Sequence, residues 1–191
     1  MPLRPFMHRM RRRWLPAAAA GLLALFAALP VLAQANPLAL AVKATYLYKF
    51  GPFVGWPRTI FATPDAPVVL CVVGDDPFGA TLDEAVVGQR IGERPIALRR
   101  LAAAERQSDC HIMYMAGSAA QPVAAALDAV RGTPVLTFTD EARGSAAKGI
   151  IHFVIRDDRV RFEIDEYAAA ENGITISSKV LSLAIAVRPR S

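Results

Sequence analysis

The chain has 191 residues, 53% of them hydrophobic, with 22 basic and 17 acidic side chains and a formal net charge of +5. This excess lies entirely in the first 35 residues, which hold five arginines and no acid, so residues 36–191 carry 17 basic and 17 acidic side chains. A neutral domain lacks the basic surface that displaces counterions from phosphates, which excludes nucleic acid as the expected partner.

Residues 1–35 have the three parts of a secretory signal peptide. A basic start, MPLRPFMHRMRRR, precedes the apolar run WLPAAAAGLLALFAALPVLAQA, which ends in a small-residue cleavage motif. Cleavage is expected before Asn36, with a start at Gln34 as the alternative. An uncleaved membrane anchor would need ~20 apolar residues, and Pro16 and Pro30 leave a shorter stretch. The sequence therefore predicts an exported, periplasmic protein with one domain of 156 residues.

An aromatic segment with two lysines, VKATYLYKFGPFVGWP (residues 42–57), opens this domain. Its apolar residues recur at helical spacing, which predicts a helix packed on the core. The predicted stripe comprises Ala39, Val42, Tyr46, Phe50 and Phe53, with Leu47 and Val54 at its edge and Thr45 facing away. Because Pro52 has no amide hydrogen, the helix should end or kink near Phe50 and Gly51. Four side chains are expected to be free to contact a partner: Lys43, Tyr48, Lys49 and Trp56.

Apolar runs and helical segments alternate in the middle of the chain. Buried strands are predicted at residues 68–74, 94–101, 111–117 and 134–140. Helices are predicted at residues 76–88, at 118–130 with Ser118 as the cap, and at 141–149 with Gly149 as the end. This rhythm predicts an α/β fold, a three-layer sandwich with a largely parallel sheet of strand order 2-1-3-4.

The last part of the chain breaks this rhythm. Residues 150–155 and 160–164 alternate in polarity around an acidic turn, which predicts a C-terminal antiparallel hairpin. Val160, Phe162 and Ile164 should face the core, and Arg161, Glu163 and Asp165 should face outward. Two helices should follow: one at residues 166–172, between Asp165 and Gly173, and one at 177–187, started by Ser177 or Ser178.

The sequence carries no recognisable catalytic or metal-binding motif. After residue 35 it has two histidines, His111 and His152, each inside a predicted strand. Asp109 lies near His111, but no third ligand stands at a metal-site spacing. We expect no cofactor, no metal and no enzyme activity, although an unrecognised hydrolase stays an alternative.

Polar residues at the carboxyl ends of the predicted strands suggest one crevice. Asp75, Asp76, Ser118 and Asp140 would meet there, as ligand-binding residues do in open parallel sheets. Their charge favours a cationic or zwitterionic ligand over an anion. The simpler interpretation is that Asp75 or Asp76 caps the following helix and Gly79 eases the turn.

The two cysteines after residue 35 are expected to form a disulfide. Cys71 and Cys110 would lie on neighbouring strands of an exported protein, and two free buried thiols are the less favoured alternative. Closing this 39-residue loop would contribute roughly 4 kcal/mol in the chain-entropy description.

Three segments resemble the YfiR-like family of small periplasmic regulators: residues 42–57, VVGDDPFG (72–79) and FEIDEYAAAENGITISSKVLSLA (162–184). Lys43, Tyr46, Phe50, Phe53, Trp56 and Pro57 match the family's lysine-aromatic helix ending in Trp-Pro. Phe162 and Ile164 match its Phe-x-Ile-Asn motif. Three features depart from the family pattern: Gly51-Pro52 replaces helix-compatible residues, Asp165 replaces the usual asparagine, and a second cysteine pair between Asp140 and Ile151 is missing.

The resemblance implies a repressor of an inner-membrane diguanylate cyclase that binds the cyclase's periplasmic domain and lowers cyclic-di-GMP and biofilm formation. It also implies release by envelope or redox stress, in some relatives through an outer-membrane lipoprotein, whereas other relatives accompany sensor kinases. Glu163 and Tyr167 are the expected contact residues. A small-molecule binding module that uses the acidic crevice is the alternative, and a homodimer stays open.

Overall fold

The protein's structure, a computed structural model, describes residues 36–190. The predicted signal peptide lies outside the described residues. Within residues 36–190, no helix combines the length and apolar character that a membrane span requires.

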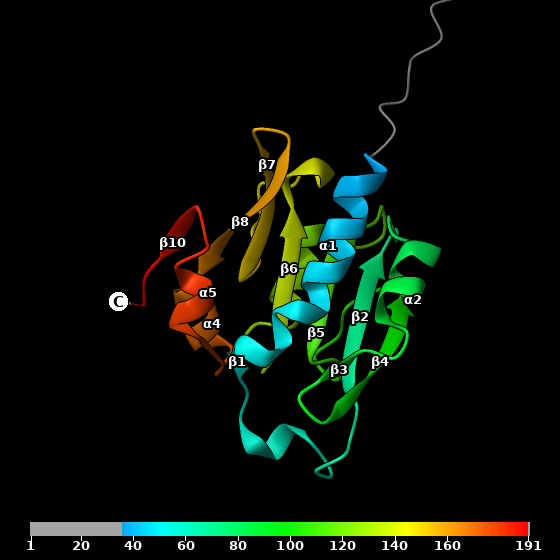
Figure 1. The fold of residues 1–191 in the computed structure, drawn as a ribbon, viewed down its shortest axis with the longest axis vertical. Coiled ribbons are helices and arrows are strands. Elements are labelled where there is room, and N and C mark those ends of the chain that lie inside the picture. The colour runs from blue at the N-terminus through cyan, green and yellow to red at the C-terminus, as the bar shows by residue number, and fades with distance from the viewer. Residues whose placement is uncertain (1–35, 191) are drawn as a thin grey trace, which may run out of the picture. The chain divides into compact units, whose positions relative to one another are not determined.

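An eight-stranded sheet of order β10-β8-β7-β6-β5-β2-β4-β3 forms the centre of the domain (Figure 1). Its strands are β2 (Val68–Gly74), β3 (Arg90–Ile91), β4 (Arg94–Leu101), β5 (Ile112–Gly117), β6 (Leu136–Asp140), β7 (Ile151–Arg156), β8 (Arg159–Asp165) and β10 (Ala186–Arg188). The strands from β4 to β7 are parallel, whereas β7 and β8 form an antiparallel hairpin. The predicted α/β class, strand order 2-1-3-4 and C-terminal hairpin are therefore confirmed.

Helices cover both faces of this sheet. On one face α1 (Pro37–Lys49) crosses in front of β5 and β6 and lies beside α2 (Ala80–Val86) (Figure 1). The core on this face joins Leu47 to apolar side chains of the central strands. On the other face α3 (Val123–Ala129) packs on β5 over Met113, Met115 and the disulfide. These layers form the predicted three-layer arrangement.

Helix α1 begins at the Asn36 cap, whose Oδ1 accepts the amide hydrogens of Leu38 and Ala39. It ends at Lys49, close to the end predicted from Pro52, which has no amide hydrogen to donate within a helix. A 3-10 turn (Gly51–Phe53) follows. The buried face of α1 is displaced from the predicted stripe. Phe50 is buried as predicted, but Ala39, Val42 and Tyr46 are only half-buried and Phe53 is 37% exposed, whereas Leu47, predicted at the edge of the stripe, is fully buried. Lys43 and Tyr48 are also buried, because α2 packs along that flank of α1. The prediction that these two side chains are free on the surface is therefore wrong.

Several predicted helices are shorter than the sequence suggested. Helix α3 begins after Pro122, and Ser118 instead accepts the amide hydrogen of Gln121 in the preceding turn. The segment after Asp140 forms only a 3-10 turn (Glu141–Arg143) that closes at Gly144. The last predicted helix is reduced to α5 (Ser178–Leu181), because the amide of Ile185 donates to the Phe162 carbonyl and brings β10 onto the sheet edge.

The segment before Trp56 pairs with the C-terminal part of the chain. Strand β1 (Val54–Gly55) forms a two-stranded antiparallel sheet with β9 (Thr175–Ile176), which follows α4 (Glu166–Glu171). A Cβ atom on Gly55 would lie 2.4 Å from Oγ1 of Thr175, so a larger residue at this position would require the Thr175 side chain to move. The small sheet thereby joins both ends of the domain.

Candidate functional site

The back of the C-terminal hairpin carries a polar groove of about 540 Å³, called here the hairpin groove. Its charged and titratable lining residues are Lys148, His152, Glu163, Asp165 and Arg188. Alternation along β8 places Glu163 on this outer face, whereas Phe162 and Ile164 are buried as predicted. Two predicted outward residues therefore meet side chains from β7, β10 and the loop before β7.

Two ion pairs neutralise the charged side chains that line the hairpin groove. Lys148 Nζ lies 2.5 Å from Oε2 of Glu163, and Arg188 Nη1 lies 3.1 Å from Oδ2 of Asp165. The other oxygen of Asp165 caps α4 by accepting the amide hydrogen of Ala168. The aspartate that departs from the family pattern thus caps the helix and also binds β10. The lysine and the arginine lie 15 and 23 residues from their carboxylate partners in sequence, so no local pattern indicates either ion pair.

His152 forms the buried side of the hairpin groove. Its Nδ1 lies 2.8 Å from the Thr139 hydroxyl, which also accepts the Gly149 amide hydrogen. Since that hydroxyl keeps one hydrogen to donate, Nδ1 of a neutral ring can accept it. Burial lowers the pKa of His152 below its usual 6.5, and the nearby Lys148 charge lowers it further.

Tyr167 lies beside this groove at the start of α4. The Arg188 guanidinium stands 4.6 Å from the centre of its ring, a cation–π contact. Tyr167 is also one of eight large hydrophobic residues that are exposed within residues 36–190. Three more of the eight lie nearby in sequence: Val187 is in β10, and Leu183 and Ile185 are in the segment between α5 and β10.

A buried ion pair occupies the carboxyl end of β6. Lys43 Nζ contacts Oδ2 of Asp140, which also accepts the Tyr114 hydroxyl hydrogen at 3.2 Å. The other Asp140 oxygen accepts the Ala142 amide hydrogen. Burial, and then the Asp140 charge, raise the pKa of Tyr114 well above its ordinary value of 10.0.

The structure divides the predicted acidic crevice. Asp76 turns away to bind Arg100 at 2.7 Å and accepts the amide hydrogens of Phe78 and Gly79, while Asp140 is neutralised by Lys43. Asp75 and Ser118 line a separate shallow hollow of about 340 Å³ that also contains Arg143. Two of the four side chains therefore have cationic partners, which removes the charge argument for a cationic ligand.

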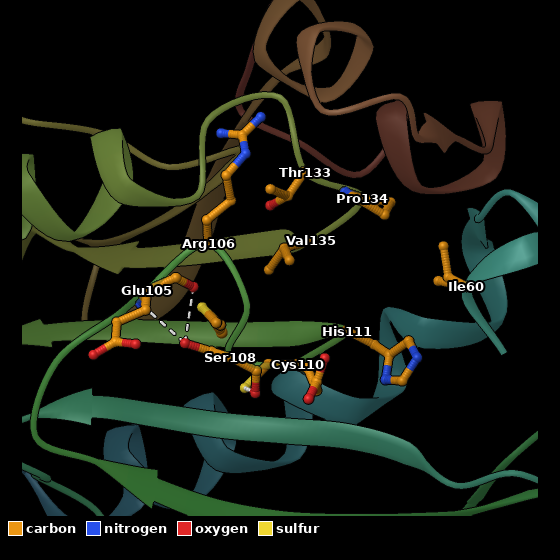
Figure 2. Close-up of a pocket in the computed structure, with 11 residues that line it drawn as sticks. Ile60, Glu105, Arg106, Ser108, Cys110, His111, Thr133, Pro134 and Val135 are labelled. Carbon is orange, nitrogen blue, oxygen red and sulfur yellow. Dashed lines mark hydrogen bonds between the residues drawn. The ribbon is translucent and has the colours of Figure 1, made fainter. Parts of the chain in front are cut away.

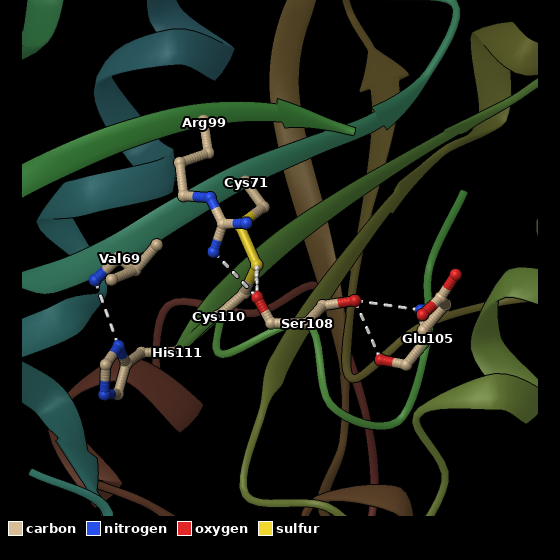
Figure 3. The surroundings of a disulfide bond; sticks show 7 residues. All are labelled: Val69, Cys71, Arg99, Glu105, Ser108, Cys110 and His111. Carbon is tan, nitrogen blue, oxygen red and sulfur yellow. Dashed lines mark hydrogen bonds between the residues drawn. A yellow bond between two sulfur atoms is a disulfide. The ribbon is translucent and has the colours of Figure 1, made fainter. Parts of the chain in front are cut away.

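The disulfide between Cys71 and Cys110 is present, as the sequence predicted, with a Cα–Cα distance of 6.1 Å. Figure 3 shows how its surroundings are held: Arg99 donates to the Ser108 carbonyl at 2.9 Å, and Val69 donates to Nδ1 of His111 at 3.0 Å. These bonds anchor the loop that precedes β5 on both sides of Cys110.

A cavity of about 260 Å³ opens beside this disulfide (Figure 2). Cys110 lines it together with His111, whereas Cys71 is fully buried. Burial lowers the pKa of His111, and its ring stacks on Phe61 at 4.6 Å between ring centres. The Arg94 guanidinium lies 3.8 Å from the centre of the Phe61 ring. This stack secures the segment before β2 and gives His111 a structural role.

The four partner-contact residues predicted near α1 have different environments. Lys43 and Tyr48 are buried, Lys49 is exposed, and Trp56 is half-buried against Phe61. The indole nitrogen of Trp56 is buried without a hydrogen-bond partner in the described part of the chain. Of these four residues, Lys49 alone is exposed.

Within residues 36–190, no three histidine, cysteine or carboxylate side chains are grouped closely enough to hold a metal ion. The clusters present are ion pairs and hydrogen-bonded networks. Such arrangements hold surface side chains in fixed positions and exclude water, and they can recognise charged groups on a partner.

A family model described as YfiR/HmsC-like matches residues 40–185. The match extends from α1 almost to β10, so it includes the disulfide and the part of the hairpin groove that precedes β10. No curated protein matches the chain.

Proposed function

The chain belongs to the YfiR/HmsC-like family, and from this premise we propose that it represses an inner-membrane diguanylate cyclase by binding the cyclase's periplasmic domain. Proteins of this family are periplasmic regulators of diguanylate cyclase signalling rather than enzymes. Repression would lower cyclic-di-GMP and biofilm formation. The periplasmic domain of a sensor kinase is the alternative partner.

The disulfide supports a periplasmic location, because such bonds persist in oxidising compartments. The basic and apolar start of the sequence supports export through a cleaved signal peptide. Intact-mass measurement of the periplasmic protein should give a chain that starts at Asn36, or at Gln34. A membrane-bound chain that retains Met1 would contradict this part of the proposal.

The proposed contact surface rests on exposed apolar residues beside the hairpin groove. Tyr167, Leu183, Ile185 and Val187 are 39, 67, 48 and 37% exposed, respectively. They lie next to two surface ion pairs that each contribute only about 0–1 kcal/mol to folding. Apolar anchors with charged neighbours are typical of protein interfaces.

Glu163 and Tyr167 are the residues on which this surface depends most. Glu163 is partly exposed and forms one wall of the hairpin groove, and Tyr167 presents an aromatic ring that is already held by Arg188. Aromatic and charged side chains in fixed positions commonly dominate binding energy. Lys49 is the remaining candidate from the first helix, since it alone among the four predicted residues is exposed.

The binding test uses tagged mature protein and the purified periplasmic domain of the membrane cyclase. Glu163→Lys and Tyr167→Ala should each weaken binding at least about tenfold, equal to roughly 1.4 kcal/mol, with no change in melting temperature beyond that expected for a surface residue. Glu93→Lys and Phe53→Ala are the matched controls. Both residues are exposed, and Glu93 lies in the turn between β3 and β4 at the opposite edge of the sheet.

The controls should bind like the unmodified protein. If all four variants bind equally well, the hairpin groove is not the contact surface. If the unmodified protein binds a sensor kinase domain and not the cyclase domain, the alternative partner is correct.

A further inference from the structure

A cavity of about 230 Å³ opens between α1 and the turn of the β7–β8 hairpin, and we call it the α1 cavity. Its apolar lining comes mainly from Ala39, Leu40, Pro77 and Ile155. The buried Lys43, Tyr114 and Asp140 line the same space, as do the exposed Arg143 and Asp158. Apolar walls with a few convergent polar groups are the usual composition of a small-molecule site.

Lys43 has more hydrogen-bond donors than the described residues satisfy. Its ammonium group has three N–H bonds, and Asp140 is its one hydrogen-bond acceptor among the described residues. Asp140 is itself shared, because it also accepts from Tyr114 and Ala142. A buried ammonium with unused donors favours a further acceptor in the α1 cavity.

Arg143 provides a second cationic group with its orientation fixed by the backbone. Its Nε donates to the Ala116 carbonyl at 3.1 Å, and its Nη2 lies 3.4 Å from the Asp75 carbonyl oxygen. No salt bridge of residues 36–190 includes Arg143. A guanidinium group held in this way keeps N–H donors for a carboxylate ligand.

We propose that the α1 cavity binds a small organic anion, a monocarboxylate with a short apolar body. Arg143 binds the carboxylate, Lys43 donates to one of its oxygens, and the apolar body packs on Leu40 and Ile155. Asp158 disfavours a second negative charge on the ligand. The ligand therefore has the opposite charge to the one that the acidic residues of the sequence suggested, because Lys43 already neutralises Asp140.

Benzoate and pentanoate are the probes, titrated into the mature protein by isothermal titration calorimetry. At least one of them should bind saturably with one site per chain. Cyclohexylamine, a cation of similar size, should not bind. Amide chemical shifts should change at the residues of the α1 cavity and not at the hairpin groove.

Two variants test the assigned roles without removing the buried ion pair. Arg143→Met should weaken carboxylate binding at least about tenfold, the loss expected for one charge-assisted contact. Ile155→Glu should weaken it similarly by placing a negative charge in the wall. Arg90→Met is the control, since this exposed arginine lies on β3 at the far edge of the sheet.

The proposal is wrong if neither carboxylate saturates the protein at up to about 10 mM. It is also wrong if Arg143→Met binds as well as Arg90→Met, or if cyclohexylamine binds more tightly than the carboxylates. Melting curves of each variant establish that it is folded. These outcomes are independent of cyclase binding, so the proposed function can stand or fall separately.

Discussion

The ammonium group of Lys43 lies 2.5 Å from Oδ2 of Asp140, a residue 97 positions later in the chain, and both residues are 5% exposed. This pair connects the first helix to the carboxyl end of β6. Removing one partner from a buried ion pair leaves an uncompensated charge, which costs more than the pair itself contributes.

Lys43→Met should therefore lower the free energy of unfolding by about 3–5 kcal/mol. Adding Asp140→Asn should restore most of the loss, because it removes the uncompensated charge. The amide oxygen can still accept from Ala142, and the amide nitrogen can donate to the Tyr114 hydroxyl oxygen. Lys49→Met, on the exposed side of the same helix, should change stability by less than about 0.5 kcal/mol. Urea unfolding measures the free energy of unfolding of all three variants. Equal losses for Lys43→Met and Lys49→Met would contradict the stabilising role of the buried ion pair.

Replacing both cysteines by alanine should also destabilise the domain. The disulfide between Cys71 and Cys110 closes a 39-residue loop, which corresponds to roughly 4 kcal/mol in the chain-entropy description. Urea unfolding of the oxidised protein, the reduced protein and the double alanine variant measures the effect. Identical midpoints for all three would show that the bond does not stabilise the fold.

Phe162→Ala should lower the free energy of unfolding by about 3–5 kcal/mol and abolish function through stability. The Phe162 ring is buried and meets Phe50 edge to face at 4.9 Å and Tyr46 at 6.1 Å. Phe53→Ala removes an exposed ring and should cost much less. Thermal unfolding compares the two, and a small effect at Phe162 would mean that the hairpin is not part of the core.

Stability should fall as the pH is lowered through about 6.5. Burial lowers the pKa of both His111 and His152 in the folded chain, so the unfolded chain binds more protons below that pH. Above about pH 7 both states carry neutral histidines, and these groups give no slope. Replacing both histidines by glutamine, which keeps a hydrogen-bond acceptor, should flatten the dependence of the urea midpoint on pH between about 5.5 and 7.5. An unchanged slope in this double variant would contradict the assignment.

The central strands were predictable because their information is local. The apolar run VVLCVVG predicts β2, and the alternation of apolar and polar residues in the hairpin predicts β8. Both patterns can be read without reference to the rest of the chain. The disulfide followed from strand order and cysteine count. Short strands were not predictable: β10 is a three-residue strand in a segment with helical composition, and its pairing with β8 decides its conformation.

The candidate sites were less predictable, because their charges are paired over long sequence distances. Asp76 and Asp140 stood out as acidic residues, but the sequence did not show that Arg100 and Lys43 neutralise them. Arg143, Lys148 and Arg188 gave no local signal, although each lines one of the cavities described above. The outward orientation of Glu163 was predictable from strand alternation, whereas its lysine partner was not.

The most direct test of the proposed repression is the cyclic-di-GMP content of cells that lack the gene. Deletion should raise cyclic-di-GMP and biofilm formation. Restoring the unmodified protein, or Glu93→Lys, should return the nucleotide to its low level, while equal amounts of Glu163→Lys or Tyr167→Ala should leave it high. Unchanged cyclic-di-GMP after deletion, under both oxidising and reducing conditions, would contradict the account.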